Sequence, residues 1–426
     1  MYKRIMKIAI LGSGGREHAL AHSIYNSKKT KKIFCLPGNA GTAEIAENVE
    51  VDINNFGLVQ NFIEEKNIDL VIVGPEKPLV NGIVDFLEKK NISVFGPKRQ
   101  SAKLEGSKVF TKHICEKYKI PTAKFGVFET KDLANNFIKN SKMPVVIKAD
   151  GLASGKGVYI CNDLSQCQNA IDEIFNGKFG TAENVLIEEF LDGEEMSFFI
   201  ISDGKTFKFF QTAQDHKRVG EGDTGKNTGG MGAYCPSKII NNHLYEKVIN
   251  QIIKPTLKAI NDLGENYTGF LYAGLMIKDG NPYLIEYNVR MGDPECQTIL
   301  PLLKSDFLDL ILACNKKTLS NFEIEWLDKK SMCIVLCAKG YPEDYKKNVE
   351  IKNIFNLKKS SESFLFHAGT LIKDKKIYSV GGRVLNFVST NTDLYNARKK
   401  ILTQINELNW NEGFFRKDIG FKAIDN

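Results

Sequence analysis

Several signatures of common protein classes are missing from this chain of 426 residues. No apolar run approaches the ~18 residues that a membrane-spanning helix needs, and the apolar start is too short for a signal peptide. The nine cysteines form no CxxC pair and no HExxH motif is present, which argues against a disulfide framework and a zinc site. A Ser/His/Asp or Cys/His signature of nucleophilic catalysis is also missing. We therefore expect a cytoplasmic protein with reduced thiols.

The composition is that of a globular protein, with 42% hydrophobic and 26% charged residues. The length favours two to four domains. The net charge of +7 comes from dispersed lysines with only short clusters, such as KKTKK at 28–32. A nucleic-acid-binding protein would concentrate this charge in a stripe. We expect no nucleic-acid or membrane partner, and an enzyme for phosphorylated substrates remains compatible with the charge.

The first hundred residues alternate between short apolar runs and helix-like segments. The apolar runs are KIAIL (7–11), KIFCLP (32–37), DLVIVGP (69–75) and ISVFGP (92–97). Nearly continuous apolar strands separated by helices predict a parallel, doubly wound α/β sheet. Ligands bind at the carboxyl ends of the strands in such sheets.

The pattern changes after residue 103. The segment VYIC follows a glycine loop with no room for a helix, which predicts a hairpin, and short strands dominate after about residue 330. We predict an N-terminal parallel-sheet domain over 1–103, a central α+β region over 104–328 with a small lid at about 125–193, and a small β-rich C-terminal domain over 329–426.

The first glycine loop, GSGGRE at 12–17, resembles a dinucleotide fingerprint. That fingerprint has a third glycine where this chain has Glu17, and an acidic residue after the second strand where this chain has CLPGN. NAD binding is therefore excluded at two positions. A turn of backbone N–H groups at a helix N-terminus, with Arg16 beside it, suits a single phosphate. A plain strand-to-helix turn without a ligand remains the alternative.

The second glycine loop, KADGLASGKGV at 148–158, does not match a P-loop, because its glycines are one residue too close and Gly157 follows the lysine. It predicts a hairpin rich in N–H donors that folds over a triphosphate, with Lys148 reaching a phosphate from the preceding strand. An exposed hairpin without a ligand is the alternative reading.

Two strands with acidic residues are further candidates for ligand binding. In LIEYNVRMGDPE (284–295), alternation places Glu286, Asn288 and Arg290 on one face, where carboxylate and amide oxygens suit Mg²⁺ and the arginine can neutralise a transferring phosphoryl group. An exposed polar face of an edge strand is the alternative. At the end of NVLIEEFL, backbone groups after Glu188 could pair with an adenine edge, and Glu195 could accept hydrogen bonds from ribose.

Taken in order, these segments resemble the ATP-grasp superfamily, and most closely the phosphoribosylamine–glycine ligases. The resemblance rests on a series of segments that spans nearly the whole chain: GSGGREHAL, PGNAGT, GPEKPLVNGIVD, LEGSKVFTK, IKADGLASGKGV, QDHKRVGEGDTGKNTGGMGAY, YAGLM, EYNVRMGDPE, FHAGT and GGRV. It implies a Rossmann-like N-terminal domain before a central ATP-grasp region.

The resemblance also implies a reaction of de novo purine synthesis. ATP, glycine and 5-phosphoribosylamine would give glycinamide ribonucleotide, ADP and phosphate through a glycyl phosphate, with Mg²⁺ or Mn²⁺, in a stand-alone monomer. Arg290 and Lys148 would be catalytic, and Glu286 and Asn288 would hold the metal. ATP would meet Lys108, Lys148, Gly151, Ser154, Gly155, Lys156, Gly157, Glu188, Phe190, Leu191 and Glu195. The amino-acid and sugar substrates would meet Gly14, Gly15, Arg16, Glu17, Asn39, Asp215, Lys217, Arg218, Gly229, Gly230, Arg290 and Asp293.

This chain departs from the family pattern at a few neighbours of these groups, including Met291 and Cys296. Two other functions stay open: a formate-using transformylase of the same superfamily, and a non-catalytic nucleotide-binding regulator. The QDHKR and NTGGMGAY segments argue against the first, and intact Lys148, Glu286, Asn288 and Arg290 argue against the second.

Overall fold

The first sheet has five parallel strands in the order β3-β2-β1-β4-β5. It belongs to a computed structural model that describes residues 5–152, 157–180, 183–357 and 360–424. In β1, Ile8 and Ile10 enter one hydrophobic core while Ala9 and Leu11 enter another. Both faces are therefore buried, which explains the continuous apolar runs and confirms the predicted parallel sheet. The strands are β1 (Met6–Gly12), β2 (Thr30–Pro37), β3 (Glu47–Asn48), β4 (Leu70–Val73) and β5 (Val94–Phe95).

Helices connect these strands and continue into the central region. Those of the sheet's connections are α1 (Gly15–Tyr25), α2 (Phe56–Lys66), α3 (Glu76–Asn81) and α4 (Ile83–Glu88). Those that lead out of the sheet are α5 (Arg99–Gly106) and α6 (Lys108–Tyr118). Ser107 lies between the last two helices, where its side chain caps α6 by accepting a hydrogen bond from the Phe110 N–H.

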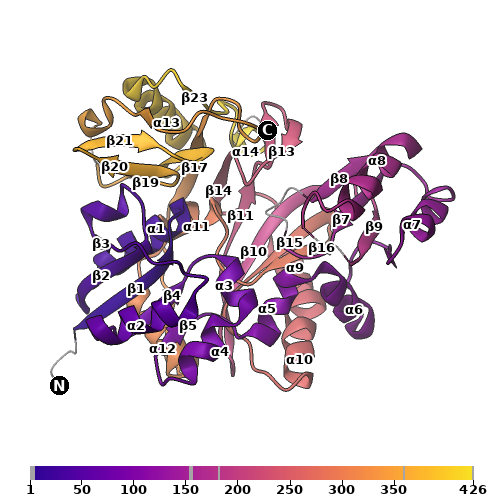
Figure 1. Ribbon diagram of the computed structural model, residues 1–426, viewed down its shortest axis with the longest axis horizontal. Helices are drawn as coiled ribbons and strands as arrows, with labels where there is room; N and C mark the ends of the chain where they lie inside the picture. Colours follow the sequence, from indigo (N-terminus) through magenta and orange to yellow (C-terminus); the bar gives the residue numbers. More distant parts are fainter. Residues whose placement is uncertain (1–4, 153–156, 181–182, 358–359, 425–426) are drawn as a thin grey trace.

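A four-stranded antiparallel sheet, in the order β6-β9-β7-β8, projects to the right of the molecule in Figure 1. Its hydrophobic core is separate from the two larger cores. Lys148 pairs with Val158 across β7 and β8, which confirms the predicted hairpin. Its elements are β6 (Phe125–Phe128), α7 (Lys131–Ile138), β7 (Val145–Ala149), β8 (Val158–Cys161), α8 (Leu164–Phe175) and β9 (Val185–Glu189).

A nine-stranded sheet forms the spine of the molecule, in the order β16-β15-β10-β11-β14-β17-β22-β19, with β23 paired to β17. It runs through the boundary predicted after residue 328, because β14 pairs with β17. Its strands are β10 (Glu194–Asp203), β11 (Phe207–Asp215), β14 (Gly232–Cys235), β15 (Thr268–Lys278), β16 (Asn281–Asn288), β17 (Lys330–Ala338), β19 (Ser363–His367), β22 (Arg383–Asn391) and β23 (Gly413–Phe414).

The remaining elements pack around this spine. Two small sheets contain β12 (Arg218–Gly220) and β13 (Thr224–Asn227), and β18 (Val349–Glu350), β20 (Thr370–Lys373) and β21 (Lys376–Ser379). The helices are α9 (Asn242–Val248), a π-helical turn (Ile249–Ile253), α10 (Lys254–Asp262), α11 (Glu295–Ile299), α12 (Phe307–Asn315), α13 (Leu394–Leu408) and α14 (Phe421–Ile424). Within the described ranges, no helix is both long and apolar enough to cross a lipid bilayer.

The N-terminal and C-terminal regions pack closely at the start of α1. Leu20 and Ile24 of α1 share one hydrophobic core with Ile334 of β17 and Phe366 of β19. In Figure 1 the C-terminal strands accordingly lie over the indigo N-terminal sheet. A Cβ on Gly15 would lie 2.3 Å from Asn386 Nδ2 and 2.5 Å from Gln297 Nε2, so only glycine fits this contact.

We expect Gly15→Ala to destabilise the protein by about 1–3 kcal/mol, because the added methyl forces two buried amide side chains apart. Gly57→Ala is the matched control. It also lies in the first turn of a helix, and its Cβ would meet a single atom at 3.4 Å. Chemical denaturation measures both variants. Equal denaturation midpoints would contradict the tight contact at Gly15.

Candidate active site

The end of strand β16 carries the predicted metal ligands. Glu286 and Asn288 alternate onto one face of the strand, opposite Gly274 and Tyr272 of β15. The strand ends at Asn288, so the expectation that Arg290 continues this strand face is wrong. Arg290 lies in the bend that follows, where an extended alternation no longer sets the direction of its side chain.

Four cations surround the Glu286 carboxylate. Burial acts to raise the pKa of Glu286, but the charges of Lys217, Lys148, Lys108 and Arg290 outweigh it and lower the pKa. Lys217 Nζ lies 3.7 Å from Glu286 Oε1 and 3.0 Å from Glu195 Oε2. The structure therefore brings together residues predicted from four separate segments, and their lysine and arginine side chains are groups of the kind that bind a polyphosphate.

The donor set at Glu286 and Asn288 fits a hard cation only in part. One carboxylate and one amide oxygen are ligands that Mg²⁺ accepts, with phosphate oxygens and water completing the coordination. No group of three or more His, Cys, Asp or Glu side chains in the described part of the chain could hold a metal ion. A metal at these two residues therefore depends on the nucleotide for further ligands.

Lys148 is held by a buried carboxylate that is shared with a second lysine. Glu188 Oε2 lies 2.9 Å from Lys148 Nζ and Glu188 Oε1 lies 3.1 Å from Lys112 Nζ, and all three side chains are at most 5% exposed. Lys112 Nζ also donates to Thr122 Oγ1 at 2.6 Å. The Glu188 carboxylate is therefore engaged by two ammonium groups.

The second glycine loop joins the start of α6. Lys108 Nζ donates to the Gly151 carbonyl at 2.8 Å, and the Lys108 N–H donates to Asp150 Oδ1 at 2.7 Å. Gly151 has a φ of +93° and open space around its missing Cβ, and the Gly157 carbonyl accepts from the Ala149 N–H. Ser154, Gly155 and Lys156 lie outside the described residues.

The predicted adenine and ribose contacts follow strand β9. Phe190 and Leu191 lie between β9 and β10, both partly exposed, and Glu195 follows on β10. The Glu195 carboxylate is 46% exposed and pairs with Lys217. Lys217 belongs to the QDHK segment and also lies near Glu286. The predicted ribose ligand is therefore in contact with this segment.

The first glycine loop packs against the segment after β16. The Gly14 N–H donates to Glu17 Oε2 at 2.6 Å, and the Arg16 N–H donates to Asp293 Oδ2 at 3.4 Å. The N-terminus of α1 is thus capped by two carboxylates. The Glu17 side chain lies against Gly74, where a Cβ would clash with the Glu17 carboxylate, so the glycine makes room for this glutamate.

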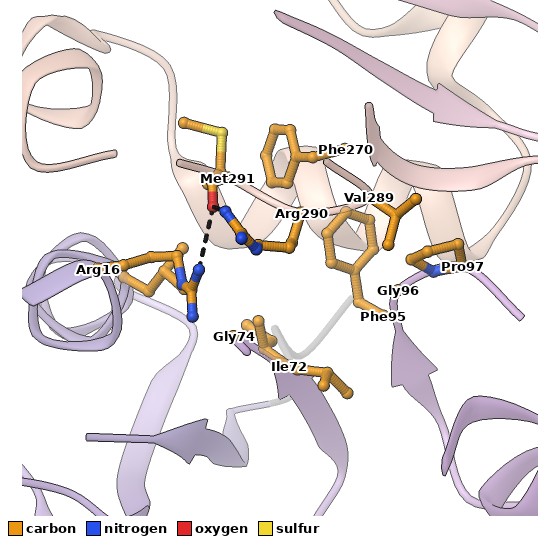
Figure 2. Close-up of a pocket in the computed structure, with 12 residues that line it drawn as sticks. Arg16, Ile72, Gly74, Phe95, Gly96, Pro97, Phe270, Val289, Arg290 and Met291 are labelled. Carbon is orange, nitrogen blue, oxygen red and sulfur yellow. Dashed lines mark hydrogen bonds between the residues drawn. The ribbon is translucent and has the colours of Figure 1, made fainter. Parts of the chain in front are cut away.

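Two arginines meet at one carbonyl beside this loop. Arg16 Nη1 and Arg290 Nη1 both donate to the Met291 carbonyl, at 3.3 and 3.2 Å. Figure 2 shows them at a pocket between the carboxyl ends of β4 and β5 and the segment after β16, with Phe95 and Phe270 on its apolar side. Arg16 Nε is paired with Glu17 Oε1 at 2.6 Å. Arg16, predicted to bind the sugar, and Arg290, predicted to stabilise the acyl phosphate, therefore contact the same carbonyl.

Asn39 connects the loop to the C-terminal region. Its Nδ2 donates to the Ser13 carbonyl at 2.9 Å and to the His367 carbonyl at 2.8 Å, and the residue is 4% exposed. Its Oδ1 accepts from the N–H groups of Gly41 and Thr42. Asn39 therefore lies beside the predicted substrate loop, and its side-chain amide links that loop to strand β19 of the C-terminal region.

Asp215, Gly229, Gly230 and Asp293 gather around Arg383. Arg383 Nη1 donates to the Asp293 carbonyl at 2.6 Å and to the Gly229 carbonyl, and Asp293 Oδ1 lies 3.4 Å from it. Burial and the nearby Glu295 carboxylate raise the pKa of Asp215 well above its usual value. A Cβ on Gly230 would lie 2.8 Å from Asp215 Oδ1, so this glycine allows the carboxyl to approach.

Arg218 is not brought to this cluster. Its Nη1 donates to the Gly225 carbonyl within its own hairpin, and its carbonyl accepts from buried Arg416 at 3.0 Å. Two residues earlier in the chain, His216 accepts a hydrogen bond from the Gly420 N–H at Nε2, and its Nδ1 lies 3.3 Å from the Gly232 carbonyl. This pattern requires a neutral ring with the proton on Nδ1.

In the described part of the chain, sequence reasoning missed four charged residues that form ion pairs with the predicted ones. They are Glu76 and Glu105, which bind Arg290, Lys112, which binds Glu188, and Arg383, which binds Asp293. All four lie in segments already quoted for the family resemblance. For Lys112 a further signal was available, because it lies four residues after Lys108 on α6 and so on the same helix face.

A four-stranded sheet whose lysine reaches a Glu-x-Asn strand, together with an N-terminal parallel sheet, is the arrangement of an ATP-grasp protein. Lys148 Nζ makes this link, 3.4 Å from the Ile285 carbonyl. Family models of phosphoribosylglycinamide synthetase match three successive parts of the chain: the N domain over 6–105, the ATP-grasp (A) domain over 106–296 and the C domain over 331–422. The chain belongs to this family.

Individual relatives agree with the family models over the whole length. The chain is 44% identical to a phosphoribosylamine–glycine ligase of Brucella melitensis over 99% of both chains. It is similar to the crystal structure of the Thermotoga maritima phosphoribosylamine–glycine ligase, with a TM-score of 0.85, 34% identity and coverage of 97% of this chain and 100% of that one. A Campylobacter jejuni biotin carboxylase in a β-γ-ATP complex shares the fold alone, with a TM-score of 0.73, 16% identity and coverage of 100% and 96%.

The environment of His216 predicts a pH dependence of stability. Burial, followed by the charge of Arg416, lowers its pKa from 6.5 to about 4, while Asp223 and Asp418 act in the opposite direction. The unfolded chain binds the proton below about pH 6.5 and the native ring only near pH 4. The stability that the neutral His216 ring contributes to the fold is therefore fully present above pH 6.5. It is lost as the pH falls towards 4, by up to about 3 kcal/mol.

Urea denaturation between pH 7 and pH 4.5 tests this. We expect the loss of stability with acid to be smaller in His216→Gln, which does not titrate, than in the wild type. His243→Gln, at an exposed position on α9, is the control and should follow the wild type. If His216→Gln loses stability as steeply as the wild type, the neutral native ring is wrong.

Proposed function

We propose that this protein is an ATP-dependent ligase that joins glycine to 5-phosphoribosylamine. The products are glycinamide ribonucleotide, ADP and phosphate, and the step belongs to de novo purine biosynthesis. Membership of the phosphoribosylglycinamide synthetase family over nearly the whole chain supports this function, as does the name carried by relatives 42–46% identical to it.

One observation carries the proposal: the segment 286–293 serves two half-sites at once. Its first residues, Glu286 and Asn288, lie among the lysines of the nucleotide side. Its last, Asp293, accepts from the first glycine loop, and Arg290 shares the Met291 carbonyl with Arg16. A phosphoryl donor and a sugar acceptor bound at these half-sites would meet at Arg290.

On the nucleotide side, lysines bind and orient the phosphates. Lys108 and Lys148 supply charge to ATP, and the loop from Gly151 to Gly157, with Ser154, Gly155 and Lys156 between them, covers the phosphates. Glu188 fixes Lys148, so its ammonium is positioned before ATP binds. The backbone at Phe190 and Leu191 takes the adenine edge and Glu195 the ribose.

On the acceptor side, charge neutralisation replaces covalent catalysis. The glycine carboxylate attacks the γ-phosphate, ADP leaves, and a glycyl phosphate forms. The amine of the sugar attacks the glycyl carbonyl and an amide bond forms, while the C–O bond to phosphate breaks, its electron pair leaves with the phosphate, and the proton lost by the amine passes to the departing phosphate or to water. Arg290 stabilises the negative charge on the acyl phosphate. We assign the acceptor side to Gly14, Gly15, Arg16, Glu17, Asn39, Asp215, Lys217, Gly229, Gly230 and Asp293, with Arg218 at its edge.

Glu286 and Asn288 would hold Mg²⁺ or Mn²⁺ together with phosphate oxygens. The ion supplies charge neutralisation on the transferred phosphoryl group when it is bound. We further propose a cytoplasmic monomer that uses the chain in three parts: 1–103 for the sugar, 104–328 for ATP with a lid at about 125–193, and 329–426 to close the acceptor side. Arg383, in the last part, contacts Asp293 and Gly229.

We expect phosphate release from ATP to require both glycine and phosphoribosylamine, because the glycyl phosphate turns over only when its acceptor is present. A coupled phosphate assay on the purified protein, omitting one substrate at a time, measures this requirement. Formate in place of glycine is the control for the transformylase alternative. Turnover with formate and none with glycine would overturn the ligase assignment, and ATP binding without any turnover would favour a regulator.

We expect Arg16→Ala to raise KM for phosphoribosylamine by about tenfold or more and to leave KM for ATP within about twofold. The reason is that Arg16 lies at the first glycine loop, away from the lysines that surround Glu286. Arg99→Ala, which removes an exposed arginine at the start of α5, is the control. Comparable rises in both KM values would count against a sugar-phosphate role for Arg16.

A further inference from the structure

We propose that Glu105 is a positioning residue that holds the Arg290 guanidinium in place for acyl transfer. The inference rests on the proposed function, which places Arg290 at the acyl phosphate. Glu105 itself lies one residue before the end of α5, in the LEGSK segment, and has no role in the proposed binding of either substrate.

The two oxygens of Glu105 bind two successive residues of the segment after β16. Oε2 accepts from the Val289 N–H at 2.8 Å, and Oε1 lies 2.7 Å from Arg290 Nη2. One carboxylate therefore fixes both the backbone from which Arg290 projects and the far end of its side chain. A long, flexible side chain held at both ends loses most of its freedom before substrate arrives.

A second carboxylate holds the same guanidinium from another element. Glu76, the first residue of α3, has Oε2 at 3.2 Å from Arg290 Nε. The side chains of Glu105, Arg290 and Glu76 are 7%, 16% and 26% exposed. The most buried member is Glu105, so water cannot replace its contact as readily as that of Glu76.

The pKa shifts of Glu105 and Glu76 also show that these two carboxyl groups and Arg290 depend on one another. Burial raises the pKa of Glu105 to about 7 although Arg290 acts to lower it, and the charge of Arg290 lowers the pKa of Glu76 to about 2. The pairing with Arg290 is thus the main favourable contact of the Glu105 carboxylate, alongside the Val289 N–H. A buried charge in this situation constrains geometry more than it adds stability.

Glu105 also lies close in the chain to a lysine of the proposed nucleotide half-site. Three residues later, Lys108 begins α6, where Asp150 accepts from its N–H and Ser107 caps the helix. The lysine for the phosphates and the carboxylate for Arg290 are therefore carried by one stretch of backbone.

Glu105→Gln tests the proposal with little change of volume. The partners of Glu105, the Val289 N–H and the Arg290 guanidinium, are both donors. A glutamine offers one accepting oxygen and one donating NH2 group, so it can keep only one of the two contacts. We expect kcat to fall between about tenfold and about 100-fold, and KM for ATP and for glycine to stay within about threefold. Glu265→Gln is the matched control, because Glu265 accepts from the Ser101 N–H of the same helix at 3.1 Å without contacting Arg290.

A double-mutant cycle separates positioning from general damage to the fold. In an Arg290→Lys background, Glu105→Gln should have no further effect on kcat, because the group through which it acts is already altered. The proposal is overturned if the two effects multiply, or if Glu105→Gln has the same kcat as Glu265→Gln.

A crystal structure of Glu105→Gln decides the question without any assay. The Arg290 guanidinium should be displaced from its position beside Glu76, and an undisplaced guanidinium would overturn the proposal. If the wild type shows no phosphate release with glycine and phosphoribosylamine, the proposed function fails, and this structural measurement still decides whether Glu105 holds Arg290.

Discussion

The need to pair every buried charge governs the arrangement of this active site. A site for a triphosphate and an acyl phosphate needs several cations, and cations removed from water are costly unless carboxylates face them. Glu188 therefore lies between Lys148 and Lys112, Glu286 lies among four cations, and Glu105 faces Arg290. The same carboxylates hold the cations in fixed positions, so the pairing that makes burial tolerable also preorganises the site for phosphate.

This pairing draws distant parts of the chain together. The nine-stranded sheet continues from the ATP-grasp strands through β14 and β17 into the C-terminal strands, which brings Arg383 to Asp293. On the other side, the start of α1 approaches so closely that Gly15 has no room for a side chain. The proposed acceptor half-site therefore lies where N-terminal, central and C-terminal segments meet, and the proposed nucleotide half-site lies between the four-stranded sheet and strand β16.

Much of the fold could be predicted because local patterns report burial. Strands covered on both faces read as continuous apolar runs, and β1 sends alternate residues into two cores. The hairpin of β7 and β8 followed from the lack of room for a helix. The expectation for Arg290 failed because period-two alternation holds only within a strand, and β16 ends two residues earlier. The sequence did not reveal that one sheet crosses the boundary predicted after residue 328, because the partner of a strand is not encoded in its local pattern.

The sequence by itself determined which segments are candidates for each kind of chemistry: glycine loops as candidates for phosphates, a Glu-x-Asn strand as a candidate for a metal, and Glu17 in place of the glycine that NAD binding requires. These are properties of short segments, in which backbone geometry and side-chain type suffice. Only the tertiary structure decided which charges face one another. Glu105 meets Arg290 across 185 positions, and Lys112 of α6 meets Glu188 of β9. Such pairs are fixed by the packing of sheets and helices, whose long-range contacts no local pattern encodes.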